Sequence, residues 1–410
     1  GGQMPEIHIF HGPMGQMGGQ MGQMGGPMGG MGQNRHRSPF KQAQKPSPIT
    51  KQISITIEQA YHGCRMPIEI EAPETYGYEN IDCNLSESSY ADQRLGDLGI
   101  SLNDLVLFYG DHLGKPALRE LIASQYKLKA DQILLTPGAA SALFMVATAL
   151  LEKGDHVIVA RSNYATNIET PRAIGAQVSF LEMEFDKGYQ IDIAALEKLI
   201  TPKTKFVSIT YPHNPTGVSI SEENLKKVIK IIEANGSYLL MDETYREMSF
   251  IPMLPLAATL SDRVISVSSM SKSYGLPGIR MGWLICQDKK LMETLLAAKE
   301  QIFITNSVVD EEIAYQYLCN KEKLFAPVKV NIQKNFEVLK RFMQGQDVLE
   351  WIEPQGGCAC FPRIKLNVEI NTKQFHEDLL NKYSTYVGPG HWFEQDDRYM
   401  RIGYSWDKTE

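Results

Sequence analysis

Cysteine is scarce in this chain of 410 residues, and its placement argues against a structural metal site. The six cysteines are scattered, and no two of them form a CxxC pair. Cys358 and Cys360 would lie on one side of a strand, but two sulfurs do not complete the four ligands of a zinc site. We therefore expect no metal and reduced thiols, as in a cytoplasmic enzyme.

Long apolar runs and an excess of positive charge are also lacking. No run approaches the roughly 20 apolar residues that span a bilayer, and no secretory signal is visible at the Gly- and Met-rich start. The formal net charge of −7 gives no general attraction to nucleic acid. The sequence thus predicts a globular protein without a membrane or nucleic-acid partner, and its length exceeds that of one usual domain.

The first 72 residues differ in composition from the rest. Residues 1–48 begin with GQMGG and GPMGG repeats and then become basic and proline-containing, which predicts a flexible segment and linker. Residues 53–57 alternate with a period of two, and 66–70 could return as a second strand of a fragment over 49–72. This region resembles the glycine-rich linker and first C-terminal-domain strands of J-domain co-chaperones. It has no His-Pro-Asp motif, so the resemblance implies at most a chaperone-related peptide-binding fusion.

Beyond an N-terminal arm over residues 73–115, short apolar runs alternate with helical patterns. Pro116 fits the first turn of a predicted helix over 115–126. Strands are predicted at 133–135, 156–160, 177–181, 206–210, 238–241, 264–267 and 282–285. One helix is predicted to follow residues 136–140 and to end at 151, and further helices are predicted at 166–174, 191–200, 222–235 and 291–303. This alternation predicts an α/β large domain over 116–325, with a mostly parallel sheet and helices on both faces.

A smaller α+β domain is predicted over residues 326–410. A long helix at 323–343 would link it to the large domain. Strands are predicted at 351–352, 358–363, 386–387 and 399–403, with a helix at 372–381. No closing helix follows the last strand, so we expect a truncated domain that is less stable.

The most informative stretch is residues 268–283, which read SSMSKSYGLPGIRMGW between two apolar runs. Lys272 would lose hydration there at a high cost unless it were neutralised, for example by condensing with an aldehyde. Ser269, Ser271 and Arg280 are hydrogen-bond donors with no acid among them, which suits a phosphate. These features indicate a pyridoxal-phosphate site anchored at Lys272. The alternative is a polar turn with a solvated lysine.

Small and aromatic residues follow two of the predicted strands, at the edge where open α/β sheets bind ligands. Gly138, Ala139 and Ala140 open a helix whose N–H groups could bind an anion, although a turn chosen for packing is as good an explanation. Tyr164 could stack on a flat ring, or it could simply pack.

Two polar side chains follow neighbouring strands of the same predicted sheet. Asn214 lies between two prolines in PHNPTG, which would hold its amide rigidly; an ordinary turn is the alternative. Asp242 directly follows an apolar strand, in DETY, so it would be buried and would need a partner such as a pyridinium nitrogen. Capping of a following helix is the other explanation for Asp242.

Together the motifs HNPTG, DETY and SMSKSYGLPGIRMG resemble those of class I/II aminotransferases, which are fold-type I pyridoxal-phosphate enzymes. The resemblance extends over about residues 76–406. It implies pyridoxal 5'-phosphate as cofactor and transfer of an amino group between an amino acid and a 2-oxo acid. Lys272 would form the Schiff base and carry the proton, Asp242 would keep the ring nitrogen protonated, and Tyr245 with Asn214 would hold the ring hydroxyl oxygen.

The resemblance implies further contacts around the cofactor. Tyr164 would stack on its ring, and Tyr109 would reach the phosphate of a neighbouring subunit, which implies a homodimer. Arg401 would bind the substrate carboxylate, with Asn214 beside it, unless Arg401 is a surface residue of an edge strand. The phosphate would be held by residues of three segments: Gly138, Ala139, Ala140, Ser269, Ser271 and Arg280.

The sequence leaves the substrate and the reaction type open. Ala140 stands where many relatives have Ser or Thr, and Ser141 is the candidate replacement. No second arginine for a distal carboxylate is identifiable, so a dicarboxylic substrate is not favoured. Lys272 and Asp242 would equally support a pyridoxal-phosphate lyase or cyclase, which would differ in its product.

Overall fold

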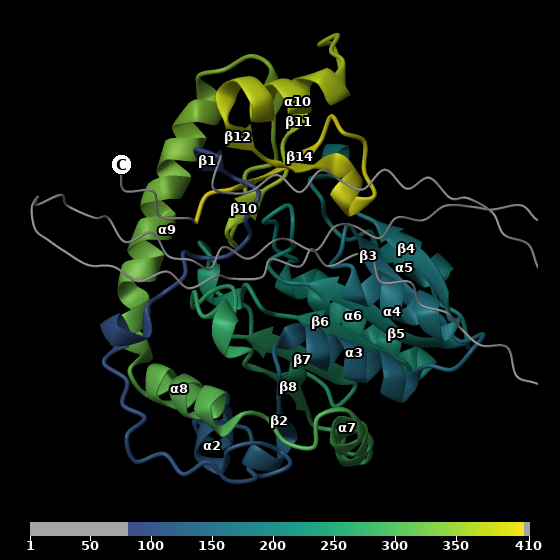
Figure 1. Cartoon of the computed structure of the whole chain (residues 1–410). Helices are drawn as coiled ribbons and strands as arrows, with labels where there is room; N and C mark the ends of the chain where they lie inside the picture. The colour runs from purple at the N-terminus through teal and green to yellow at the C-terminus, as the bar shows by residue number, and fades with distance from the viewer. Residues whose placement is uncertain (1–80, 406–410) are drawn as a thin grey trace, which may run out of the picture. The chain divides into compact units, whose positions relative to one another are not determined.

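The computed structural model describes residues 81–405 (Figure 1), so the segments predicted over 1–48 and 49–72 lie outside the described residues. A seven-stranded sheet of order β2-β8-β7-β6-β5-β3-β4 dominates this part. Its strands are β2 (Ile133–Thr136), β3 (His156–Arg161), β4 (Gln177–Glu182), β5 (Thr204–Thr210), β6 (Tyr238–Asp242), β7 (Val264–Ser269) and β8 (Gly282–Cys286). Strand β8 runs in the opposite direction to the other six strands of this sheet. The predicted α/β fold with a mostly parallel sheet is confirmed.

Helices cover both faces of the sheet because its strands are apolar on both sides. In β3, Val157 and Val159 pack in one buried cluster, whereas Ile158 and Ala160 pack in the cluster on the opposite face. The two clusters alternate along β3 because successive side chains of a strand point to opposite faces of the sheet. The first cluster includes residues of α3 (Ala139–Leu150), α4 (Thr166–Ile174) and α7 (Lys289–Ile302), and the second includes residues of α5 (Ile193–Leu199) and α6 (Glu222–Asn235).

Three further helices connect the sheet to a smaller set of strands. They are α2 (Pro116–Gln125), which begins at the predicted proline, α8 (Val308–Cys319) and the long α9 (Lys321–Gln344). Helix α8 was not predicted. The Ser307 side chain accepts the N–H of Asp310 at 3.3 Å and so caps its first turn. Helix α9 runs from the level of α8 up to α10 (Thr372–Tyr383) (Figure 1).

The smaller set of strands differs in detail from the prediction. Its strands are β1 (Cys83–Asn84), β9 (Leu349–Glu350), β10 (Ala359–Cys360), β11 (Arg363–Ile364), β12 (Thr385–Tyr386), β13 (Gly388–Pro389) and β14 (Met400–Gly403). The strand predicted at 351–352 is wrong, because the ladder with β11 lies two residues earlier and the Trp351 ring packs near Phe336 instead. The strand predicted at 358–363 is two strands, since Pro362 between them has no N–H to donate to a ladder.

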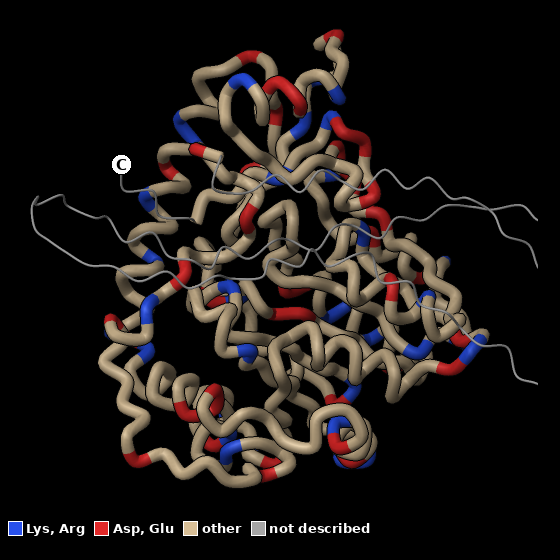
Figure 2. The backbone as a smooth tube through the Cα atoms, in the orientation of Figure 1, with Lys and Arg blue, Asp and Glu red and all other residues tan. Residues whose placement is uncertain are grey.

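The 3-10 helices are short and lie in the connections. They are η2 (Leu95–Leu98), η3 (Ala130–Gln132), η4 (Phe185–Lys187), η5 (Arg246–Met248), η6 (Ala257–Thr259), η7 (Pro277–Ile279) and η8 (Gly390–Phe393). Within residues 81–405, no helix has the length and apolar character needed to cross a membrane. The same residues contain no group of three or more His, Cys, Asp or Glu placed to hold a metal ion. Positive and negative residues are scattered over the described backbone (Figure 2).

Candidate active site

The predicted site residues meet at one edge of the large sheet. Gly138 follows β2, Asn214 follows β5, Asp242 is the last residue of β6, and Lys272 follows β7. These strands run parallel, so their carboxyl ends share an edge, which is where open α/β sheets bind ligands.

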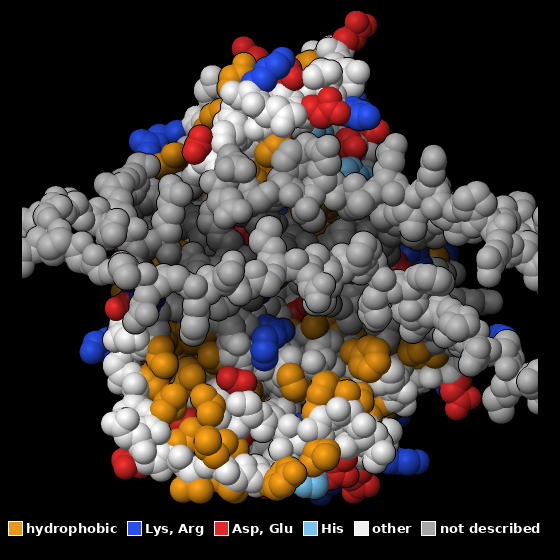
Figure 3. Space-filling model, in the orientation of Figure 1, with side chains coloured by type: hydrophobic (Ala, Val, Ile, Leu, Met, Phe, Trp, Pro, Cys, Tyr) orange, Lys and Arg blue, Asp and Glu red, His pale blue; other side chains and the backbone are white. Residues whose placement is uncertain are grey.

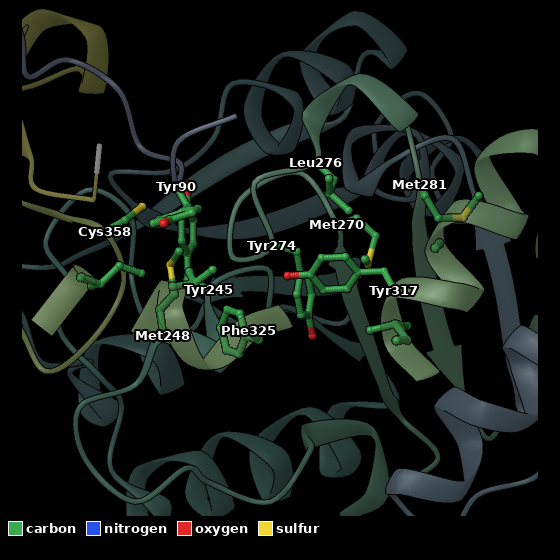
Figure 4. Packing of buried hydrophobic residues seen from close by; sticks show 14 of the residues in the cluster. Tyr90, Tyr245, Met248, Met270, Tyr274, Leu276, Met281, Tyr317, Phe325 and Cys358 are labelled. Carbon is green, nitrogen blue, oxygen red and sulfur yellow. The ribbon is translucent and has the colours of Figure 1, made fainter. Parts of the chain in front are cut away.

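Lys272 and Tyr245 converge on a serine from the start of the described chain. The Lys272 amine donates to Ser88 Oγ at 3.4 Å, and the Tyr245 hydroxyl donates to the same oxygen at 3.2 Å. Figure 4 shows Tyr245 beside Tyr90 in the buried cluster. Burial is the main cause that lowers the pKa of Lys272, so the neutral amine is favoured there. Ser88 was not predicted as a site residue.

Asp242 is a buried carboxylate held in one orientation. Its Oδ1 accepts the backbone N–H of Thr244 at 3.1 Å and the Thr244 hydroxyl at 2.6 Å. Burial raises the pKa of Asp242, and the two bonds from Thr244 oppose this effect. No α-helix starts at this residue, so capping does not explain it.

The loop that carries Asn214 is fixed by a buried histidine. His213 Nε2 lies 2.6 Å from the Ser162 carbonyl oxygen and Nδ1 lies 2.8 Å from Thr216 Oγ1. Because a carbonyl only accepts, the Nε2 proton is donated to Ser162, and Nδ1 accepts from the threonine hydroxyl. Burial lowers the pKa of His213 to about 4. The neutral ring therefore holds this loop in place.

Gly138 and Arg280 form the candidate phosphate cradle at the start of α3. A Cβ at Gly138 would lie 2.7 Å from the Arg280 Nη2, so only glycine lets the guanidinium reach this backbone. A Cβ at Gly282 would come 2.7 Å from the Ala139 nitrogen, which shows how closely β8 approaches the start of α3. Arg280 Nη1 also donates to Ser271 Oγ at 3.3 Å.

The remaining predicted phosphate ligands surround this cradle. Ser269 is buried and its hydroxyl accepts the N–H of Ser271 at 3.4 Å. Ala139 and Ala140 form the first turn of α3. Ser141, the candidate replacement for a missing hydroxyl, donates to the Pro137 carbonyl at 3.0 Å.

Arg401 is a buried guanidinium that no carboxylate neutralises by direct contact in the described chain. It is 8% exposed, so the surface alternative is wrong. Its two terminal nitrogens donate to neutral oxygens, Asn214 Oδ1 at 3.4 Å and the Ser86 carbonyl at 2.5 Å. Its Nε is buried without a hydrogen-bond partner among residues 81–405. A buried cation of this kind suits an anionic ligand.

Cys358 is a buried residue of the hydrophobic cluster that contains Tyr245, and it was not predicted as a site residue. Burial raises the pKa of its thiol to about 11, so the thiol stays neutral.

Two predicted residues are not brought into contact with the others. Tyr164 is 49% exposed and Tyr109 is 83% exposed. Neither side chain forms a hydrogen bond within residues 81–405. Their predicted contacts with cofactor remain predictions.

The chain is similar to known proteins over most of the described part. A family model described as aminotransferase class I and II matches residues 85–410. A capreomycidine synthase of Streptomyces vinaceus is 27% identical over 312 residues, which cover 75% of this chain and 79% of that protein. An arginine–pyruvate transaminase of Pseudomonas aeruginosa is 32% identical over 186 residues, which cover 43% of this chain and 47% of that protein.

A solved structure agrees with the fold. A pyridoxal-phosphate-dependent aminotransferase from Streptococcus suis superposes with a TM-score of 0.75 at 28% identity. The similarity covers 80% of this chain and 90% of that one.

Proposed function

Because the chain belongs to the class I and II aminotransferases, which use pyridoxal phosphate, we propose that the residues around Lys272 carry out amino-group transfer between an amino acid and a 2-oxo acid. The observation that supports this assignment is the convergence of three groups at one sheet edge. The partly buried amine of Lys272 and the buried carboxylate of Asp242 lie there, and the buried guanidinium of Arg401 is hydrogen-bonded to Asn214 at the same edge.

The residues present fit the cofactor. Gly138 and Arg280 would hold its phosphate, with Ser269 and Ser271 beside them, because a guanidinium and a hydroxyl next to the N-terminus of α3 suit an anion. Asp242, desolvated and oriented by Thr244, would pair with the ring nitrogen. The bound group supplies an aldehyde that condenses with an amine and a ring that accepts electrons.

Lys272 would act as nucleophile and proton carrier. Burial lowers the pKa of the Lys272 amine, which favours the neutral form that can take a proton from the substrate and return it. Ser88 and Tyr245 hold the amine in position from one side.

Arg401 would bind the substrate carboxylate. The guanidinium presents two terminal nitrogens, and exchanging the neutral oxygens of Asn214 and Ser86 for a carboxylate would give stronger, charge-assisted bonds. The amino group of the substrate would then be placed on the side of Lys272.

Borohydride labelling tests the proposal directly. The purified full chain is loaded with pyridoxal phosphate, reduced, digested and mapped by mass spectrometry. The label should lie on the peptide that contains Lys272, and Lys272→Ala should abolish both the label and transamination. Lys226→Ala, on an exposed helix face, is the matched control. A label on another lysine would refute the assignment.

A lyase or cyclase reaction at the same residues is the second candidate. It is favoured by one observation, the 27% identity to a protein named capreomycidine synthase. Product analysis separates the two. Transamination yields a 2-oxo acid from the donor and a new amino acid from the acceptor, whereas the alternative needs no acceptor.

A homodimer would complete the site. The segment from Val106 to Tyr109 exposes four large apolar side chains, each between 63% and 83% exposed. Hydrophobic side chains also gather in the lower part of the view in Figure 3. An exposed apolar patch of this size is typical of a protein interface, and Tyr109 would then reach the cofactor phosphate of the second copy.

A further inference from the structure

The connection between β13 and β14 lies along the Arg401 side chain. In the ladder of these two strands Gly388 is opposite Arg401, and a Cβ at Gly388 would come within 3.3 Å of the Arg401 Cβ. The connection continues through η8, which ends at Phe393, and the centroid of the Phe393 ring lies 5.0 Å from the guanidinium carbon of Arg401. Both ends of the Arg401 side chain therefore contact this one loop.

Phe393 holds the guanidinium of Arg401 in one orientation. The ring is 8% exposed and meets the Phe361 ring edge to face, with the centroids 5.3 Å apart. A cation over the face of an aromatic ring is attracted to it, and the attraction is stronger where water is excluded. Because the ring restricts the guanidinium, it also restricts the direction of the two terminal nitrogens that contact Asn214 and Ser86.

Glu394, the residue after Phe393, connects this loop to the large sheet. Its carboxylate lies 3.6 Å from Arg161 Nη2, and Arg172 Nη1 donates to it at 3.2 Å. Arg161 is the last residue of β3, and Arg172 lies on α4. One carboxylate from the loop therefore bridges two guanidinium groups of the elements around the large sheet.

The two arginines have further contacts that fix their side chains. Arg161 Nη1 lies 3.3 Å from Glu182 Oε1, and Arg172 Nη1 also donates to Glu169 at 2.7 Å. Both guanidinium carbons lie over the Phe180 ring, at 4.0 Å and 5.6 Å from its centroid. A network of this kind holds a carboxylate more firmly than a single pair of exposed side chains does.

We propose that Glu394 is a positioning residue for substrate binding. Anchored to Arg161 and Arg172, it fixes the end of η8 and keeps the Phe393 ring against Arg401, so that the guanidinium is oriented to receive the substrate carboxylate. Glu394 acts through Phe393 rather than on the substrate itself. The inference rests on the proposed function, because it uses Arg401 as the ligand of that carboxylate.

Binding of butanoate, a carboxylate without an amino group, tests this role apart from turnover. Titration calorimetry measures its Kd on the full chain loaded with pyridoxal phosphate. In Glu394→Gln the Kd should rise about three- to tenfold, because the amide has lost the charge that binds both arginines. Glu394→Asp keeps the charge and should lie nearer the wild-type Kd. Glu223→Gln, at another exposed carboxylate paired with a basic side chain, should keep the wild-type Kd.

Kinetics and unfolding separate positioning from a structural defect. In Glu394→Gln the KM for the amino donor should rise by the same factor as the Kd for butanoate, while kcat and the urea unfolding midpoint stay at their wild-type values. In a Phe393→Leu background, where the ring face is gone, Glu394→Gln should add no further loss. Arg172→Gln, on the exposed side of α4, removes one partner of Glu394 and should also raise the Kd. This variant decides if Glu394→Gln does not fold.

The outcomes that would overturn the proposal are distinct from a failure of the proposed function. A wild-type chain that does not bind butanoate, or Glu394→Gln and Arg172→Gln chains that bind it equally well, would show that Glu394 does not position Arg401. The same holds if KM, kcat and the urea midpoint all worsen together. If no amino donor yields a 2-oxo acid and Lys272 takes no label, the proposed function fails, and calorimetry with butanoate still decides the role of Glu394.

Discussion

At the scale of single residues, the site depends on charges kept away from water. Asp242 is 6% exposed, and within residues 81–405 the hydrogen bonds to its carboxylate come from Thr244. Such a carboxylate is costly to bury, and the proposed pairing with a protonated ring nitrogen of the cofactor would offset that cost.

Replacing Asp242 by asparagine should separate charge from shape. Asparagine keeps an oxygen for Thr244 but loses the negative charge, so kcat/KM for transamination should fall by about 10²–10³-fold, as when one electrostatic contact to a reacting group is removed. Steady-state kinetics with saturating cofactor measures this. Asp262→Asn, at an exposed turn before β7, should retain wild-type kinetics. Equal activity in both variants would show that the ring-nitrogen role is wrong.

His213 should make stability depend on pH in a defined window. Its pKa is about 4 in the folded chain and 6.5 in the unfolded chain, so the unfolded chain binds more protons between these values. The contribution of the neutral His213 ring to the free energy of unfolding is complete above pH 6.5. It is lost as pH falls toward 4, and the total loss is about 3 kcal/mol. Urea unfolding at pH 7.5, 5.5 and 4.5 measures it. His213→Asn should show a shallower loss across this window, and an identical pH profile in the variant would contradict the assignment.

At the scale of elements, helices α5, α6, α7, α8 and α10 each begin after a side chain that accepts a free N–H group of the first turn. Ser221 precedes α6 and accepts the Asn224 N–H at 3.1 Å, and Glu222 and Glu223 lie in the first turn. Both features stabilise the positive end of the helix.

Removing the Ser221 cap should lower the free energy of unfolding by an amount typical of a helix N-cap. Ser221→Ala should lower the free energy of unfolding by about 1 kcal/mol, whereas Ser221→Asp should keep the wild-type value, because aspartate caps as well as serine. Urea titrations at neutral pH compare the two. If alanine and aspartate lower the unfolding midpoint equally, the hydrogen bond is not what stabilises the start of α6.

The sequence predicted the elements of the large sheet well and missed α8, for a physical reason. In strands and amphipathic helices the buried residues recur with a clear period. In α8 the sequence VVDEEIAYQYLC places apolar residues nearly all around the helix, so no face stands out. The start of α8 is marked in the sequence only by the capping residue Ser307 and by Asp310 and Glu311 in the first turn.

At the scale of the whole molecule, Asp242 and Lys272 could be predicted from their motifs, but the contacts of Ser86 and Ser88 could not. Asp242 ends β6 and Lys272 follows β7. The carboxyl ends of parallel strands can be located from sequence, and they are where open α/β sheets bind ligands. Ser88 belongs to an irregular stretch, and its contact with Lys272 joins residues 184 positions apart. Only the tertiary fold brings such a segment to the site.

The proposed dimer gives a prediction at this scale. Leu107 is 76% exposed in one protomer and would be covered in the pair, so Leu107→Asp should shift the protein to monomers, because a charge would then be buried without a partner. Light scattering coupled to size exclusion measures the mass. Val330→Asp, at a residue that is 66% exposed on α9, should leave the mass unchanged. A wild-type monomer, or a dimer that survives Leu107→Asp, would rule out this surface.

The bond between Arg401 and the Ser86 carbonyl joins residues 315 positions apart. During synthesis, Ser86 leaves the ribosome long before Arg401, so this contact can form only after residue 401 has emerged. A chain stopped before residue 401 would possess Lys272 but would lack the guanidinium proposed to bind the substrate carboxylate.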